Sequence, residues 1–331
     1  MSKGWLKAIA ESPALSDTIS IVGLVDLDLA QAQARAEEFA PGAAVGSDLD
    51  AMLVAQKPDL LFDVVVPQAR RAVVETGLRH GCHVLSEKPM ASSLDEARAL
   101  VAAAGAAGRI HAVVQNRRYN PGVRRLRRLI AEGTLGEITS VNCDFFVGAH
   151  FGGFREQMRN VLLLDMAIHT FDAARFMSGK VPEAVYCLET NPRGSWNLHG
   201  AAANAVFEFS DGVVFNYRGS WVAEGANTSW DSSWRITGTK GTVLWDGLDQ
   251  FSGGLVAGDE GFFRPLAPIV IPEPADAGQT EGHASVLRAF VAGVDSNTPP
   301  ETASFDNITS LAMVFAAIES GATRSRVLIQ S

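Results

Sequence analysis

The chain has 331 residues, of which 47% are hydrophobic and 20% are charged, and its formal net charge is −9. This composition is typical of a globular protein with two domains, and the acidic balance argues against a nucleic-acid-binding protein, which needs a basic surface. No apolar run reaches the roughly 18 residues that span a bilayer, and the three cysteines lack the spacing of a disulfide framework or zinc site, so we expect a cytoplasmic protein with no membrane partner and no metal.

The first part of the chain alternates short apolar runs with helical patterns. The run at 19–26 ends in Asp26, and the run at 60–66 is almost continuously apolar, which is typical of a parallel strand buried on both faces. Further strands are predicted at 44–45, 82–85 and 110–114, with helices at 29–39, 49–56, 68–80 and 92–107. This alternation predicts an α/β domain with a doubly wound parallel sheet over residues 1–115.

The pattern changes after residue 120. Longer runs of alternating polar and apolar residues, joined by the turns SDG and KG, predict a mostly antiparallel sheet. Helices are predicted at 121–132, 161–178, 281–295 and 305–321. We therefore expect residues 116–331 to form an α+β domain with a large open-faced sheet. The arginines of helix 121–132 are interpreted as a solvated face, because the chain as a whole is acidic.

Asp26 closes the first predicted strand, at the end where open α/β folds bind ligands. An acid at the end of the second strand of a dinucleotide fold accepts hydrogen bonds from the adenosine ribose hydroxyls, and its charge repels a 2′-phosphate. Asp28 follows and no arginine does, so NAD is favoured over NADP. The alternative is a strand-end acid that caps the next helix.

The tripeptide Glu87-Lys88-Pro89 follows the predicted strand at 82–85. Proline fixes its own φ and biases the residue before it toward an extended conformation, so the lysine is a positioned cation. Its ammonium group can then be directed into the crevice at the carboxyl end of the sheet. The alternative is an exposed salt bridge at the end of a strand.

Asp165 and His169 lie four residues apart on the predicted helix 161–178 and therefore project from one face. A histidine there can act as general base toward a substrate hydroxyl, with the aspartate orienting it or contacting the substrate. The alternatives are a structural hydrogen-bonded pair or two metal ligands. Metal is disfavoured because the sequence shows no third or fourth ligand nearby.

Together these motifs resemble the Gfo/Idh/MocA family of oxidoreductases, the relatives of glucose-fructose oxidoreductase and inositol dehydrogenase. The similar segments lie at 83–90, 115–138, 162–176, 234–245 and 300–320. The resemblance implies a Rossmann-type NAD(P)-binding domain, and an NAD-dependent hydride transfer between nicotinamide and a secondary alcohol carbon of a sugar, cyclic polyol or derivative. The alternative is a catalytically silent protein that senses sugars or dinucleotides on the same fold.

The resemblance also implies roles for individual residues. Lys88 would hydrogen-bond substrate and cofactor ribose, and Asp165 and His169 would match the family's D-x-G-x-H pair, with His169 as acid/base. The residues assigned to the cofactor are Asp26, Pro67, Glu87, Lys88 and Asn116. Those assigned to the substrate are Lys88, Arg117, Arg155, Asp165 and His169.

The chain departs from the family pattern at several points. Ala167 replaces the glycine of the D-x-G-x-H pair, REQMRNVLLLD stands where a glycine-rich stretch is usual, and Arg70 stands where many relatives have histidine. These departures leave the substrate unidentified. The first strand and most of the GxGxxG loop are also missing, so we expect the natural protein to start upstream of Met1, with a strand between those at 19–26 and 60–66.

The strands at 201–209 and 212–221 carry large apolar residues on both faces in the sequence interpretation. Val206, Val213, Phe215 and Tyr217 are not expected to share one face with Phe207, Phe209, Val214 and Trp221. An open sheet would then expose an apolar patch, which usually marks an interface. We therefore expect a homodimer or homotetramer assembled through this sheet.

Overall fold

The computed structural model describes residues 2–331, which divide into two compact units. The first unit contains the chain up to Asn116 together with Glu281–Ile308, and the second contains Arg117–Thr280 and Thr309–Ser331. Residues 281–308, placed in the second domain by the sequence interpretation, therefore group with the first unit. The functional boundary expected between residues 115 and 116 stays a prediction. Each unit is considered by itself below.

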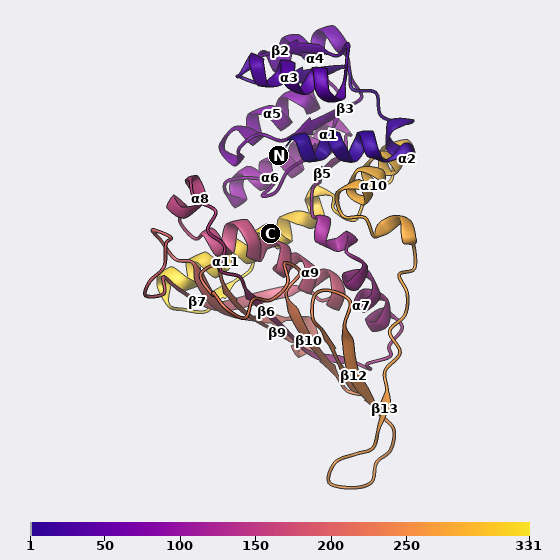
Figure 1. The fold of residues 1–331 in the computed structure, drawn as a ribbon, viewed down its shortest axis with the longest axis vertical. Coiled ribbons are helices and arrows are strands. Elements are labelled where there is room, and N and C mark those ends of the chain that lie inside the picture. The colour runs from indigo at the N-terminus through magenta and orange to yellow at the C-terminus, as the bar shows by residue number, and fades with distance from the viewer. Residues whose placement is uncertain (1) are drawn as a thin grey trace. The chain divides into compact units, whose positions relative to one another are not determined.

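The first unit contains parallel strands that alternate with helices (Figure 1). They form two sheets, one of β1 (Gly23–Val25) and β2 (Ala44–Gly46), the other in the order β3 (Leu60–Asp63), β4 (His83–Ser86) and β5 (His111–Val113). This confirms the predicted parallel α/β architecture. Within residues 2–331 no ladder joins β1 to β3, so the expected single sheet is present as two.

The helices of the first unit begin where the sequence supplies capping residues. The side chain of Asp28 accepts backbone N–H bonds at the start of α3, and Asp48 and Ser93 do the same for α4 and α6. The helices are α1 (Ser2–Glu11), α2 (Pro13–Ser16), α3 (Leu29–Phe39), α4 (Leu49–Gln56), α5 (Pro67–Arg79), α6 (Leu94–Ala107) and α10 (His283–Asp295). The rings of Trp5 and Phe290 both pack against Phe62, with centroids 5.6 and 6.2 Å from it, so α1 and α10 are held against β3.

The second unit is built on a nine-stranded sheet in the order β13-β12-β11-β10-β6-β9-β8-β7-β14. Only β6 and β9 pair in parallel, which confirms the predicted large, mostly antiparallel sheet. The strands are β6 (Ile138–Phe146), β7 (Pro182–Thr190), β8 (Ala202–Phe209), β9 (Val214–Ser220), β10 (Ser233–Gly238), β11 (Gly241–Trp245), β12 (Phe251–Val256), β13 (Leu266–Pro268) and β14 (Val327–Leu328).

Helices lie along one side of this sheet (Figure 1). They include α7 (Pro121–Ala131), α9 (Ile168–Ser178) and the part of α11 (Ser304–Thr323) from Thr309 onward. Shorter elements are η1 (Asn116–Tyr119), which begins at the last residue of the first unit's N-terminal part, α8 (Phe154–Gln157) and the π-helical η2 (Leu162–Ala167). The ring of Phe171 on α9 packs edge-on against Phe207 and Tyr217, with centroids 4.7 and 5.1 Å apart. None of the helices in residues 2–331 is long and apolar enough to cross a membrane.

The assignment of faces on β8 and β9 corrects the sequence interpretation. The two strands pair Phe207 with Phe215 and Ala205 with Tyr217, and residues directly opposite in an antiparallel pair lie on the same face. The odd-numbered residues of both strands therefore face the helices and are buried: Phe207, Phe209, Val213, Phe215, Tyr217 and Trp221. Only even-numbered residues such as Val206, which is 46% exposed, face away. The eight residues named in the sequence interpretation do not all share one face, as expected, but the two that face away, Val206 and Val214, are both valines, so no aromatic residue of the set lies on the outer face.

Candidate active site

The Glu87-Lys88-Pro89 turn begins directly after β4, as predicted. The Glu87 carboxylate is buried and accepts a 2.7 Å hydrogen bond from the indole Nε1 of Trp5 on α1. It also accepts a 3.2 Å bond from the backbone N–H of Lys88. The structure thus places Glu87, which was predicted to bind the cofactor, at a contact that holds α1 against the turn carrying Lys88.

A buried ion pair lies beside this turn, and the sequence interpretation missed it. Arg70 on α5 donates from Nε to Oδ2 of Asp63, the last residue of β3, at 2.7 Å. The acid within the apolar run LLFDVVV, followed by an arginine seven residues later, was the available signal. Arg70 was noted only as a departure from the family pattern.

Asp26 follows β1 directly and is exposed. Its Oδ1 accepts a 2.9 Å hydrogen bond from the backbone N–H of Asp28, and Asp28 is the residue that caps α3. The alternative role of Asp26 as the helix cap is therefore wrong. Pro67, also assigned to the cofactor, is the first residue of α5.

The second unit brings Arg155 and Asp165 together. Arg155 on α8 donates from Nε to Oδ2 of Asp165 at 3.0 Å, and its guanidinium lies over the rings of Phe151 and Phe154. Asp165 lies in η2, so the predicted helix contains a π-helical turn, a feature frequent at functional sites. His169 follows in the first turn of α9 and is 9% exposed.

Arg117 and His169 line one small cavity of the second unit, together with Asp231 and Trp230. Arg117 donates from Nη1 to Asp231 Oδ1, and Asn120 donates to Oδ2 of the same carboxylate at 2.8 Å. Burial lowers the pKa of Arg117 to about 10, so its guanidinium stays charged at neutral pH. Asp231 was not predicted, since it lies in a polar loop with no motif around it. Asn116, assigned to the cofactor, is half-buried at the start of η1.

Each unit therefore offers part of the chemistry that the sequence suggested. The second unit carries the Arg155–Asp165 ion pair and, in a small cavity, Arg117 with the buried imidazole of His169. These groups suit proton transfer and the binding of hydroxyl groups. The first unit presents an exposed carboxylate after β1 and a cation after β4. This donor set fits a dinucleotide, because Asp26 can accept hydrogen bonds from ribose hydroxyls and Lys88 can interact with a polar group beside the nicotinamide.

Two family models match the chain. Residues 5–115 match the oxidoreductase family model with an NAD-binding Rossmann fold, and residues 123–244 match the GFO/IDH/MocA C-terminal domain. The chain belongs to the Gfo/Idh/MocA family. The Gfo/Idh/MocA assignment confirms that this is an oxidoreductase and that its N-terminal part is of the NAD-binding Rossmann type.

Similar proteins match this chain over most of its length. The 1,5-anhydro-D-fructose reductase of Ensifer adhaerens is 25% identical over 280 residues, which cover 82% of this chain and 80% of the relative. A crystal structure of an oxidoreductase from Agrobacterium radiobacter, in complex with NAD⁺, L-tartaric acid and magnesium, shares the fold with a TM-score of 0.81 at 21% identity, covering 98% of this chain and 96% of that one. Levoglucosan dehydrogenase in complex with NADH and L-sorbose has a TM-score of 0.81 at 19% identity, covering 100% and 96%.

Proposed function

We propose that the protein is an NAD-dependent dehydrogenase that oxidises a secondary alcohol of a sugar, cyclic polyol or derivative, or catalyses the reverse reduction. The observation that carries the proposal is the Arg155–Asp165 ion pair, four residues before His169, in a chain of an NAD-binding oxidoreductase family. The sugar-reducing and sugar-oxidising relatives support the substrate class. The three cysteines are buried thiols without disulfides, which supports a reducing cytoplasmic location.

The residues divide the chemistry between them. When bound, NAD supplies the hydride acceptor or donor. His169 takes the proton of the substrate hydroxyl in the oxidative direction and returns it in the reductive direction. Asp165, held by Arg155, orients the imidazole or binds a neighbouring hydroxyl group, and Arg117 binds a further substrate oxygen. Lys88 places positive charge beside the oxygen on which negative charge develops.

A panel of sugars, cyclic polyols and anhydro sugars tests this function. Incubated with the protein and NAD⁺, at least one secondary alcohol is expected to yield NADH, which absorbance detects, and the product is a ketone. If NAD⁺ and a panel member bind in calorimetry while every compound fails to react, the catalytically silent sensor becomes the correct description.

We infer that the protein prefers NAD over NADP because Asp26 places an exposed carboxylate at the end of β1. Calorimetry on the wild type should show weaker binding of NADP⁺ than of NAD⁺. Asp26→Asn should narrow that difference by on the order of tenfold, equivalent to ~1.4 kcal/mol. Asp95→Asn, which removes an exposed charge on α6, is the matched control and should leave the ratio unchanged. Equal affinities in the wild type would remove Asp26 from its assigned role.

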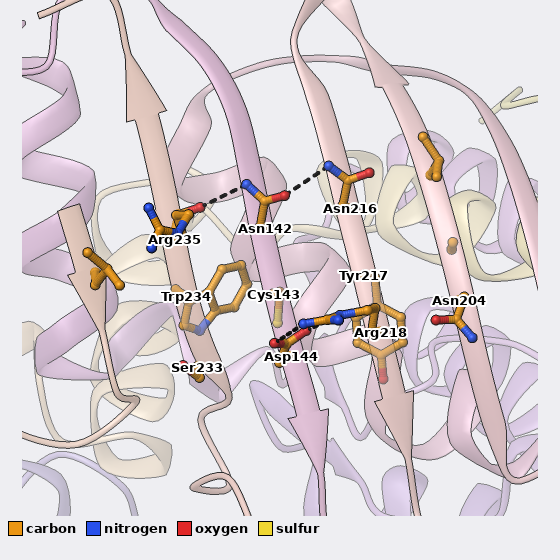
Figure 2. Close-up of a pocket in the computed structure, with 13 residues that line it drawn as sticks. Asn142, Cys143, Asp144, Asn204, Asn216, Tyr217, Arg218, Ser233, Trp234 and Arg235 are labelled. Carbon is orange, nitrogen blue, oxygen red and sulfur yellow. Dashed lines mark hydrogen bonds and ion pairs between the residues drawn. The ribbon is translucent and has the colours of Figure 1, made fainter. Parts of the chain in front are cut away.

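We further propose that the protein forms a homodimer or homotetramer through the open face of the second unit's sheet. This face carries a polar groove of about 580 Å³ in which Asn216 donates to Asn142 and Arg218 forms a two-pronged ion pair with Asp144 (Figure 2). Val206, one of the residues that line the groove, is paired with Tyr186 across β7 and β8, and both side chains are exposed. Because the face carries adjacent opposite charges, a second copy related by a two-fold axis can meet it with complementary charges.

The oligomer prediction can be tested by light scattering at micromolar concentration. The wild type should give a mass of at least twice 35.2 kDa. Val206→Glu should shift the population toward the monomer, because it adds a charge to the apolar part of the face. Val54→Glu on α4, at a similarly exposed valine of the first unit, should leave the mass unchanged. A monomeric wild type would contradict the proposal.

A further inference from the structure

Arg70 connects two loops of the first unit that follow neighbouring strands. Besides its bond to Asp63, it donates from Nη2 to the backbone oxygen of Val65 at 2.5 Å, in the loop after β3. From Nη1 it donates to the backbone oxygen of Pro89, in the turn after β4. The side chains of Arg70 and Asp63 are 1% and 0% exposed, so water does not compete for these bonds.

The ion pair continues into a buried polar network across the ends of the three strands. Oδ1 of Asp63 accepts the backbone N–H of Val65 at 3.1 Å, and Ser86, the last residue of β4, is the ladder partner of Asp63 on the neighbouring strand. The Ser86 hydroxyl in turn contacts Nε2 of His111 on β5 at 3.1 Å. Burial, together with the charge of Arg70, lowers the pKa of His111 to about 3. The imidazole is therefore neutral at physiological pH, and the charges of the network are those of Arg70 and Asp63.

A buried ion pair is weak evidence for stability, since an apolar pair of similar volume is often equally or more stabilising. Its value lies in directional bonds that an apolar pair cannot make. The bond to Pro89 is the informative one, because proline has no N–H and its carbonyl oxygen is the group through which its backbone can be held. Fixing that carbonyl restrains the Pro89–Met90 peptide unit, which begins one residue after Lys88.

We propose that Arg70, anchored by Asp63, is a positioning residue that fixes the backbone of the Glu87-Lys88-Pro89 turn and so sets the direction of the Lys88 side chain. The inference rests on the proposed function, in which Lys88 contacts substrate and cofactor. A misplacement of about 1 Å can cost on the order of 10² in rate, so loss of this restraint should be visible in turnover.

The double variant Asp63→Leu/Arg70→Met removes both charges together and leaves no buried unpaired ion, so it should remain folded. We expect its kcat on the best polyol to fall by roughly tenfold to 10²-fold, with KM for that substrate changed by only a few-fold. The single variant Arg70→Lys should also have a lowered kcat. The three bonds of Arg70 start from three separate nitrogens of a planar group, whereas the N–H donors of an ammonium all start from one nitrogen. Arg71→Met is the matched control, since Arg71 is the neighbouring residue, exposed and paired only with Glu75 among the ion pairs that the described residues form.

A cycle with Lys88→Ala separates positioning from general stability. If Arg70 acts through Lys88, the substitutions Asp63→Leu and Arg70→Met should lower kcat when they are introduced into the wild-type protein. They should have little further effect on kcat when they are introduced into Lys88→Ala. Hydrogen exchange on the protein without cofactor supplies a second readout. Amides of residues 86–91 should lose protection in the double variant, while those of α6 should not.

Three results would overturn the inference. One is a double variant that keeps kcat within twofold of the wild type. Another is a loss of kcat that is equally large with and without Lys88, which would indicate a structural effect. The last is unchanged protection of residues 86–91. Failure of the proposed function looks different, because the wild type would then turn over no compound of the panel, while exchange at 86–91 would still respond to the double variant.

Discussion

Replacing Lys88 by alanine should lower turnover by on the order of 10²-fold or more while the protein remains folded, since positioned charges and proton-transfer groups typically contribute that much. Lys88 is the second residue after β4, and the buried Glu87 carboxylate and the Arg70 bond to Pro89 hold the turn on either side of it. Steady-state rates per folded molecule, with folding followed by circular dichroism, measure the effect. Lys7→Ala, at an exposed lysine of α1, is the control and should keep the wild-type rate.

Lys88→Arg should also turn over much more slowly than the wild type. The planar, bulky guanidinium does not replace a compact ammonium group at a position defined by a tight turn. If Lys88→Ala retains activity within a few-fold, or if arginine substitutes fully, the lysine is a strand-end cation of the kind considered as the alternative in the sequence. The proposed role in stabilising the developing oxyanion would then be withdrawn.

The sequence predicted the features that depend on local pattern. The ends of β1 and β4 put Asp26 and Lys88 where the alternation of strands and helices indicated. The antiparallel sheet followed from period-two runs and short turns. The sequence did not show which residues of β8 and β9 face the helices, because this depends on register, which the turn between the strands sets by pairing Phe209 with Val213.

The missed contacts join residues that are distant in sequence. Trp5 meets Glu87 across 82 positions, and Arg117 meets Asp231 across 114. No periodicity or spacing reports such a pair, because it forms only when separate elements pack. Asp63 and Arg70 are only seven positions apart, but their significance depends on complete burial, which a polar residue in an apolar run does not establish alone. The sequence thus located the loops of the candidate site and missed the groups that fix their geometry.

His169→Asn should abolish the pH dependence of turnover near neutrality, since histidine is the side chain whose unperturbed pKa lies in that range. In the oxidative direction the neutral imidazole must accept the hydroxyl proton, so the wild-type rate should rise with pH near neutrality, and the variant's residual rate should not. His80→Asn, which removes an exposed histidine paired with Asp50, should keep the wild-type profile. A profile that survives in His169→Asn would assign the proton transfer to another group.

Asp165→Asn should weaken substrate binding and turnover together, because the neutral amide holds Arg155 less firmly and misorients the imidazole or loses a hydroxyl contact. Asp172 on α9 is the control residue, because its role is structural. It is fully buried, accepts two 2.7 Å bonds from Arg118 and one of 2.6 Å from Ser310, and has no assigned part in catalysis. Asp172→Asn should destabilise the fold by about 3–5 kcal/mol, because it breaks a buried ion pair.

Comparing the two aspartate variants therefore distinguishes a catalytic role of Asp165 from a structural one. Asp165 lies in the π-helical turn and is part-exposed, so its replacement should change thermal stability little and activity per folded molecule strongly. Asp172→Asn should do the reverse. Thermal unfolding measured beside specific activity distinguishes the outcomes. If Asp165→Asn and His169→Asn both lower the unfolding temperature as Asp172→Asn does, while the folded fraction reacts at the wild-type rate, then the Asp165–His169 pair only stabilises its helix and the acid/base group lies elsewhere.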